Sequence, residues 1–301
     1  MKYSEDNKPF VCMMTNSTCY KGTSIGKPVG ILWHSTGCNN SNLSRYVQPS
    51  DNDKNREKLL SIIGKNQYNN DWNHTNVQAG LNAWIGKLAN GEVTTIQTMP
   101  WNYRPWGCGS GKNGSCNGKT GGPTWLQFEI CEDGLNDKNY FDKCYKEACE
   151  LTAYLCKMFN INPNGTVDYN GLKVPTILCH WDSYNLGLGS SHYDVYNWFN
   201  KYNKTMQDVR NDVKNILEDD DMTQEKFNEM MNTWIKEQSN KKPDDWSAED
   251  RQWAEENNII NGDSSGNKMY KKYVTREEMA AMLHRANAVS KPRPRKKTTT
   301  E

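Results

Sequence analysis

The chain has 301 residues, of which 35% are hydrophobic and 24% are charged, and its formal net charge is +1. This length exceeds what one small domain usually needs, since roughly 150 residues per domain is a fair prior. No apolar run approaches the roughly 18–20 residues of a membrane span, so the sequence excludes a transmembrane protein. We expect neither membrane insertion nor a nucleic-acid partner.

Charge and cysteine are distributed unevenly along the chain. Residues 1–205 carry 20 basic and 17 acidic side chains, residues 206–286 carry 12 and 18, and residues 287–301 carry 5 and 1. All ten cysteines precede residue 180. These shifts predict a folded domain over 1–205, a helical acidic linker over 206–240, a small module over 241–286 and a disordered basic tail over 287–301.

The cysteines and the N-terminus bear on the compartment. No Cys-x-x-Cys pair occurs, which argues against a zinc finger. Glu5 and Asp6 stand where a secretory signal would carry a basic and then an apolar stretch. We therefore expect cytoplasmic synthesis and reduced thiols. Cys108 and Cys116 flank a Gly-rich loop that a disulfide could close in an oxidising environment.

The predicted elements begin with a buried strand over 29–33, which ends at His34. Strands that alternate with helices predict an α/β fold with a central mixed β-sheet flanked by helices. Helical patterns after residue 206 add a small C-terminal helical module. The other predicted elements are a helix over 53–64, paired strands within 77–99 that turn at 90–91, a strand over 125–130, a helix over 137–159, a loop over 163–171, a strand over 174–179 and a Gly-rich loop over 182–191.

Three of the five histidines stand at the ends of predicted elements, where functional sites concentrate: His34, His180 and His192. Catalytic zinc sites use three protein ligands and keep a fourth position for water. His34, His180 and one of His192 or Asp194 could supply these ligands. Two distant histidines could equally be core or surface residues. Two histidines with a carboxylate also form the ligand set of non-haem iron oxygenases, so the ligands alone do not choose the metal.

Four segments in order resemble the motifs of the type-2, zinc-dependent N-acetylmuramoyl-L-alanine amidases, a family that includes peptidoglycan recognition proteins. The stretches VGILWHSTGCNNSNLSRYVQPSDN and WNYRPWGCGSGKNGSCN are similar to endolysins of phages that infect clostridia and related Gram-positive bacteria. The resemblance spans about residues 8–205. The four segments are residues 30–36 (GILWHST), 128–130 (FEI), 179–182 (CHWD) and 191–199 (SHYDVYNWF).

The resemblance implies a role for each residue at its motifs. His34, His180 and Asp194 match the Zn²⁺ ligands, and Glu129 matches the acidic residue that faces the metal. Zinc-bound water is a nucleophile near neutral pH, because the metal lowers its pKa to about 7. Glu129 would then carry the proton from this water to the leaving nitrogen. His192 stands where many members have Lys and would stabilise the oxyanion, although it could instead be the third ligand with Asp194 behind it.

An aromatic run precedes the Gly-rich loop. Trp101, Tyr103 and Trp106 would suit sugar rings and peptide stems as substrate-binding residues. Packing of Trp101 and Trp106 into the core accounts for them equally well. Many family members have His after the second Trp, where this chain has Gly107.

The C-terminal segment resembles one S-layer homology repeat, in residues 253–256, 259–263 and 273–279. Thr275 is a plausible helix N-cap that forms a capping box with Glu278. The resemblance implies that Thr275 and Arg276 contact an anionic wall polymer, although such modules usually occur as three repeats. The expected partners are therefore peptidoglycan, a secondary wall polymer and a second copy of the chain as a homodimer.

The sequence thus predicts a phage endolysin that hydrolyses the amide between N-acetylmuramic acid and L-alanine and lyses Gram-positive hosts. It would stay in the host cytoplasm until lysis and then act on the cell wall. The main alternative is a non-catalytic peptidoglycan-binding protein of the same fold. A host autolysin would differ in biology rather than in chemistry. A cysteine peptidase with Cys38, Cys131 or Cys179 as nucleophile is a weaker alternative, because cysteines beside apolar runs are mostly packing residues.

Overall fold

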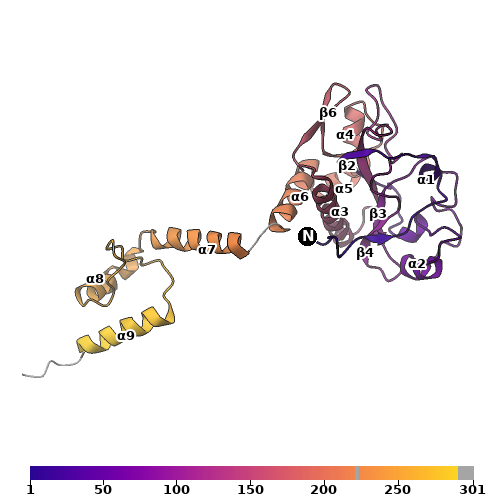
Figure 1. Ribbon diagram of the computed structural model, residues 1–301. Helices are drawn as coiled ribbons and strands as arrows, with labels where there is room; N and C mark the ends of the chain where they lie inside the picture. The colour runs from indigo at the N-terminus through magenta and orange to yellow at the C-terminus, as the bar shows by residue number, and fades with distance from the viewer. Residues whose placement is uncertain (221–223, 291–301) are drawn as a thin grey trace, which may run out of the picture. The chain divides into compact units, whose positions relative to one another are not determined.

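The computed structural model describes residues 1–220 and 224–290. The chain divides into two compact units, Met1–Asp221 and Met222–Glu301 (Figure 1). None of the helices within the described ranges combines the length and the apolar character that a membrane crossing requires.

A six-stranded mixed sheet forms the centre of the first unit, in the strand order β1-β4-β3-β5-β2-β8. Strands β3, β5, β2 and β8 run parallel, whereas β4 pairs with β3 antiparallel. The predicted central mixed sheet is therefore confirmed. The strands are β1 (Phe10–Val11), β2 (Lys27–Ser35), β3 (Ala83–Lys87), β4 (Val93–Gln97), β5 (Pro123–Ile130) and β8 (Ile177–Cys179), and a separate hairpin consists of β6 (Thr166–Tyr169) and β7 (Leu172–Pro175).

Helix α3 (Lys138–Phe159) packs across one face of this sheet against β2, β3 and β4, and α6 (Met206–Asp220) packs on α3 (Figure 1). The side chain of Asp137 accepts a hydrogen bond from the Asn139 amide at the start of α3. Asn160 ends the helix in the left-handed conformation. The other helices of this unit are α1 (Thr18–Gly22), η1 (Leu43–Arg45), α2 (Arg56–Ile63), α4 (His180–Asn185) and α5 (Tyr196–Tyr202).

The alternation of side chains along β2 and β5 separates an apolar face from a polar one. Trp33 and Phe128 lie in the main hydrophobic cluster together with α3. Because successive residues of a strand point to opposite faces, their neighbours in sequence face away from α3. These neighbours are His34, Gln127 and Glu129. The register pairs His34 with Glu129, so both side chains lie at the same height of the sheet.

Most predicted elements of the first unit are confirmed, but the segment between residues 163 and 185 differs. The predicted loop over 163–171 contains β6, because Asn170 and Gly171 have positive φ angles of 50° and 80° and form a two-residue hairpin turn. The single strand predicted over 174–179 is divided between β7, which ends at Pro175, and β8. The Gly-rich loop predicted from residue 182 begins inside helix α4.

The predicted linker over 206–240 is wrong in its first half. Met206, Val209 and Val213 of α6 are buried in the main core of the first unit. Asp220, which belongs to the acidic run taken as a linker signal, forms an ion pair with Lys157 of α3. The core thus extends through α6, since an amphipathic helix that buries a complete apolar stripe belongs to the domain it covers.

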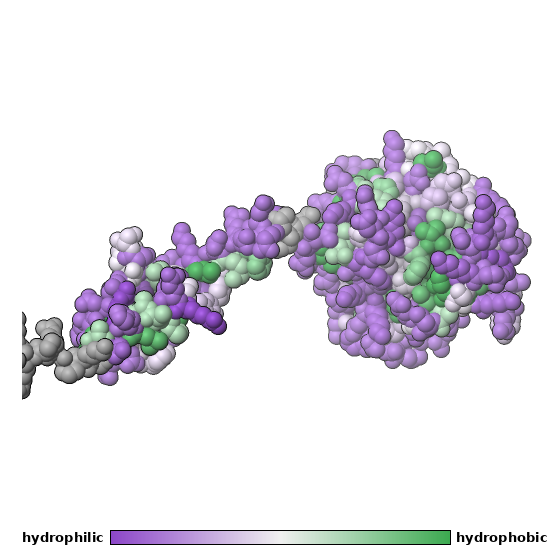
Figure 2. All heavy atoms as spheres, turned by 60° about the horizontal axis from the view of Figure 1, so that its bottom comes forward, coloured by the Kyte–Doolittle hydropathy of each residue, from purple (hydrophilic) through white to green (hydrophobic). Residues whose placement is uncertain are grey.

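The second unit is helical and buries little apolar surface. It contains α7 (Gln224–Ser239), η2 (Asp245–Ser247), α8 (Ala248–Glu256) and α9 (Arg276–Ser290). Among its described residues, Ala254 and Ile259 are the buried apolar side chains. Helix α9 runs into the predicted tail as far as Ser290, and residues 291–301 of that tail lie outside the described residues. Apolar side chains gather on the surface of this unit (Figure 2), and its exposed large ones are Phe227, Met230, Met231, Trp234, Trp246, Trp253, Tyr273, Val274, Met279, Leu283 and Val289.

Truncation of the chain tests the position of the domain boundary. We expect a chain that ends at residue 205 to be less stable by more than about 3 kcal/mol than one that ends at residue 220, because each buried apolar side chain of α6 contributes roughly 1.5–3 kcal/mol. Urea unfolding followed by tryptophan fluorescence measures the difference. Equal unfolding midpoints for the two chains would show that α6 does not belong to the core.

Candidate metal centre

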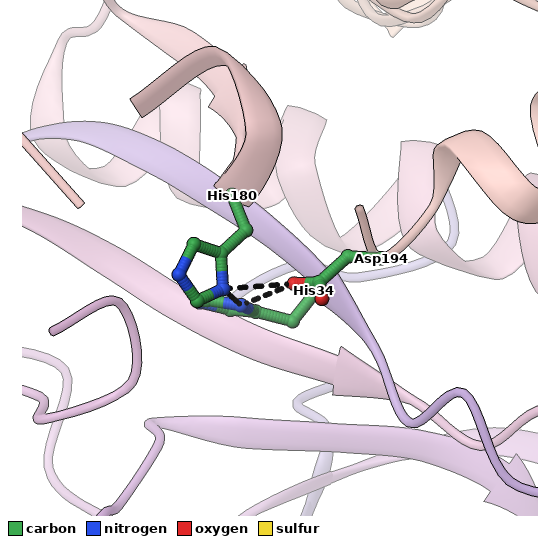
Figure 3. Close-up of side chains that lie close together, drawn as sticks. All are labelled: His34, His180 and Asp194. Atoms are coloured by element: carbon green, nitrogen blue, oxygen red, sulfur yellow. Dashed lines mark hydrogen bonds and ion pairs between the residues drawn. The ribbon is translucent and has the colours of Figure 1, made fainter. Parts of the chain in front are cut away.

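Three residues from distant parts of the sequence converge at the carboxyl ends of the parallel strands. His34 is the penultimate residue of β2, and His180 is the first residue of α4, directly after β8. Asp194 lies in the loop before α5 with a φ of 47°, a left-handed conformation that Asp tolerates better than most residues. Figure 3 shows the two imidazole rings and the carboxylate pointing toward one another.

The donor atoms of these residues lie very close together. Asp194 Oδ2 is 2.8 Å from His34 Nδ1 and 3.0 Å from His180 Nδ1, and the two Nδ1 atoms are 3.1 Å apart. A tetrahedral site with bonds of about 2.05 Å to its ligands has edges of about 3.3 Å, so the observed separations are only slightly shorter. Within the described residues, this is the one group of three or more His, Cys, Asp or Glu side chains that could hold a metal ion.

The electrostatics of the group suit a cation. Burial lowers the pKa of His180, which keeps its imidazole neutral. Burial acts to raise the pKa of Asp194, but the adjacent imidazoles of His180 and His34 outweigh it and hold that pKa well below its usual range. Metal ions bind neutral imidazole and ionised carboxylate, so both residues are in the required protonation state.

Glu129 lies beside this group on the same face of the sheet. Burial raises its pKa well above the usual value, and the neighbouring charges of Asp194 and Glu132 raise it further. Burial and neighbouring charges account for this shift, with no hydrogen bond to the carboxylate from the described residues among its causes. A carboxyl group without a donor and with a raised pKa is suited to accept and return a proton near neutral pH.

His192 lies next to the group without being part of it. Its ring centroid is 4.8 Å from that of His180, and its Nδ1 is 3.1 Å from Ser190 Oγ. The side chain is exposed. The converging set therefore contains Asp194 rather than His192, and a role of His192 at the oxyanion stays a prediction.

The predicted substrate-binding aromatic residues lie on the segment of chain just before Gly107 and Cys108. Trp101 packs against the main core, and the ring of Tyr103 lies 5.3 Å from that of Tyr20. Trp106 packs on Gly22, where an added Cβ would lie 2.7 Å from the indole. Their packing is thus visible, and substrate binding stays a prediction.

Sequence reasoning missed three residues that contact the histidines. Gln127 Oε1 is 3.0 Å from His34 Nε2, and both the carbonyl of Cys108 and Ser190 Oγ are 3.1 Å from His180 Nε2. A signal for Gln127 was present, because a polar residue two positions before Glu129 in an apolar strand lies on the same face. The roles of Cys108 and Ser190 leave no such trace in the sequence.

The cysteines are free thiols. Cys108 and Cys116 are buried in one apolar cluster and form no disulfide, so the closure considered for this loop is absent. Burial raises the pKa of Cys131 and of Cys179, which disfavours the thiolate that a cysteine peptidase would need.

The fold and the site together define an α/β protein with a buried centre of two histidines and one aspartate at the carboxyl edge of a mixed sheet. A family model described as N-acetylmuramoyl-L-alanine amidase matches residues 25–195, more than half of the chain and all of the site. The chain belongs to this family, as its sequence motifs predicted.

Comparison with solved structures finds further likenesses. The structure of PlyL is 16% identical, with 67% of this chain and 93% of that chain covered and a TM-score of 0.40. Staphylococcus aureus hydrolase AmiA in complex with its ligand is 20% identical, with 70% and 80% covered and a TM-score of 0.37. A mutant endolysin from Bacillus subtilis is 16% identical, with 67% and 97% covered and a TM-score of 0.39. No curated protein sequence matches the chain.

The C-terminal resemblance to an S-layer homology repeat stays a prediction, since the family match ends at residue 195. Thr275 Oγ1 accepts the amide of Glu278, whose carboxylate accepts the amide of Thr275. This is the predicted capping box, and it explains Thr275 without a ligand. Arg276 is exposed at the start of α9.

Replacement of Glu129 tests the electrostatic description of the site. In metal-free protein the raised pKa makes ionisation of Glu129 cost stability at pH values above the unfolded value of 4.5. We therefore expect Glu129→Gln to stabilise the metal-free protein by about 1–3 kcal/mol at pH 7. The gain should shrink as the pH falls and disappear below about pH 4.5.

Chemical unfolding after chelation, at a series of pH values, measures this effect. Glu92→Gln is the matched control, because Glu92 is exposed on the β3–β4 hairpin. A Glu129→Gln protein that is no more stable than the unaltered chain at pH 7 would contradict a buried, unpaired carboxyl group.

Proposed function

We propose that this chain is a zinc-dependent peptidoglycan amidase that hydrolyses the bond between N-acetylmuramic acid and L-alanine. The observation that carries the proposal is the convergence of His34, His180 and Asp194 beside the unpaired carboxyl group of Glu129. The family to which the chain belongs is named for this reaction.

His34 and His180 would hold the zinc ion through their Nδ1 atoms, and Asp194 through Oδ2. When bound, the ion supplies Lewis-acid activation of water and of the substrate carbonyl. Three protein ligands leave room for water, as in catalytic rather than structural zinc sites. The imidazole and carboxylate donors also suit iron, and the family membership favours zinc.

Glu129 and His192 would carry the proton transfers and the charge stabilisation. Glu129 accepts a proton from the attacking water as the C–O bond forms, and it returns this proton to the nitrogen as the C–N bond breaks. An N–H of His192 would stabilise the negative oxygen of the tetrahedral intermediate. The products are a lactyl carboxylate and a free alanine amine.

A non-catalytic binding protein needs neither metal ligands nor a base. This chain has both in one buried group, which favours catalysis over binding alone. Trp101, Tyr103 and Trp106 are proposed to bind the sugar or the peptide stem.

We also propose that the chain is an endolysin of phage type, present in the host cytoplasm until lysis and active at the cell wall afterwards. The similarity of its N-terminal stretches to clostridial phage endolysins supports this proposal. Binding of a secondary wall polymer by Thr275 and Arg276 stays a prediction.

Replacement of the base tests the catalytic role. We expect Glu129→Ala to lower the rate of peptidoglycan hydrolysis by about 10²–10⁴-fold, the usual contribution of a general base, while zinc remains bound. Mass analysis of peptidoglycan digested by the unaltered chain should show free N-terminal alanine and no new reducing sugar ends. His34→Ala is the paired control and should lose the metal itself. Full activity of Glu129→Ala, or new reducing ends, would refute the amidase assignment.

The second unit leaves most of its large apolar side chains exposed. Among its described residues only Ala254 and Ile259 bury apolar side chains, whereas Phe227, Met230 and Leu283 are at least half exposed. A domain of this size rarely gains enough free energy from its own core to be stable. We propose that a second copy of the chain packs against these helices, as the expected homodimer requires.

Light scattering of the full chain during gel filtration tests self-association. We expect the unaltered chain to have the mass of a dimer or a larger assembly. Met230→Glu and Leu283→Glu together should shift it towards the monomer, because they place charges in the apolar contact. Tyr68→Glu is the matched control, since Tyr68 is an exposed aromatic residue of the first unit. A monomeric unaltered chain would contradict the proposal.

A further inference from the structure

The backbone of Cys108 contacts both sides of the metal centre. An amide N–H can only donate a hydrogen bond, and a backbone carbonyl can only accept one. These two groups therefore dictate the orientation of every amide and imidazole that is connected to them. Side-chain amides and imidazoles, in contrast, can each present either a donor or an acceptor.

The N–H of Cys108 determines the orientation of two side-chain amides. It donates to Asn117 Oδ1 over 3.1 Å, so the oxygen of Asn117 must face it. The same oxygen accepts Nε2 of Gln127 over 2.9 Å. Gln127 must therefore turn its own oxygen towards His34, whose Nε2 lies 3.0 Å away.

The carbonyl of Cys108 acts directly on the other histidine. Its oxygen lies 3.1 Å from Nε2 of His180 and also accepts the amide of Ser190 over 2.8 Å. Because this oxygen can only accept, it favours a hydrogen on Nε2 of His180, and the Ser190 hydroxyl, 3.1 Å from the same Nε2, can accept as well. Nε2 of His34 is favoured to carry one for the same reason, since Gln127 Oε1 faces it.

A neutral imidazole has one N–H and one lone pair. With both hydrogens on Nε2, both lone pairs lie on the Nδ1 atoms, which face each other and Asp194 Oδ2 within 3.1 Å. Three electron-pair donors then converge without a hydrogen between them, and a bound cation satisfies all three.

We propose that the backbone of Cys108 sets the tautomers of both histidines, of His180 directly and of His34 through the positioning residues Asn117 and Gln127. The inference deepens the proposed zinc site and rests on it for its functional meaning. The tautomers themselves can be measured without metal, substrate or activity.

Gly107 makes this arrangement possible. An added Cβ at this position would lie 2.2 Å from Gln127 Oε1 and 3.1 Å from His34 Nε2. A side chain there would therefore expel the amide from its place beside His34. Glycine at residue 107 leaves room for the amide between the backbone and the imidazole.

The first experiment reads the tautomers directly in the metal-free full chain. Long-range ¹H–¹⁵N correlation spectra distinguish Nδ1–H from Nε2–H imidazole, and above about pH 8 an ordinary imidazole is neutral. We expect both His34 and His180 to be in the Nε2–H form. Nδ1–H at either ring in the unaltered chain would overturn the proposal, whether or not any variant folds.

Gln127→Leu separates a positioning role from a purely structural one. It removes the acceptor of His34 and leaves the acceptor of His180 in place. We expect His34 to become a mixture of tautomers while His180 stays Nε2–H. An unchanged His34, or an equal change in both rings, would contradict the proposal.

Zinc affinity, measured by competition with a chelator, provides the second readout. Loss of a hydrogen-bond partner behind a metal ligand typically costs 10–100-fold in affinity, and we expect a loss of this size for Gln127→Leu and in the same direction for Gly107→Ala. Gln97→Leu is the matched control, because Gln97 is a buried strand glutamine that donates to the Met99 carbonyl, away from the site.

Unaltered zinc affinity in both Gln127→Leu and Gly107→Ala would overturn the proposal. If Gln127→Leu does not fold, Gly107→Ala and the tautomers of the unaltered chain decide the question. Predicted tautomers in a chain without amidase activity would leave this inference standing and refute the proposed function.

Discussion

The candidate site depends on the close approach of two imidazole nitrogens and one carboxylate oxygen in a buried place. His34 Nδ1, His180 Nδ1 and Asp194 Oδ2 lie within 3.1 Å of one another. Polar atoms crowded together out of water are costly unless hydrogens or a cation lie between them. The surrounding structure maintains this crowding, because β2 supplies His34, the start of α4 supplies His180, and a loop residue with left-handed backbone supplies Asp194.

One face of the sheet forms the hydrophobic core, and the opposite face carries the polar residues of the candidate site. The face with Trp33 and Phe128 packs on α3 and forms the main core, which extends to α6. The opposite face carries Gln127 and Glu129, and the buried carboxyl group of Glu129 costs free energy in the absence of metal. Burial of the apolar face against α3 offsets this free-energy cost. The polar residues lie on the same strands as the core residues, but their side chains point to the opposite face.

The second unit is not stabilised by a large buried core among its described residues. It is held by helix caps, by surface ion pairs such as Lys271 with Asp244, and by the stacking of Trp234 on Tyr273. Surface ion pairs contribute little to stability. Burial of the exposed apolar side chains of this unit against another surface would therefore contribute the most free energy. The family match covers only residues of the first unit, so it says nothing about the function of the second unit.

Local patterns in the sequence are enough to predict the strands that carry His34 and Glu129, the long helix α3 and the β3–β4 hairpin, because periodicity and turn residues are local signals. Its motifs also singled out the three residues that converge. The folded chain, in contrast, is needed to see that α6 belongs to the core and that Gln127 and Cys108 contact the histidines. These contacts join residues 72 and 93 positions apart. Such pairs are set by how the strands and loops meet in space, which no local pattern of side chains records.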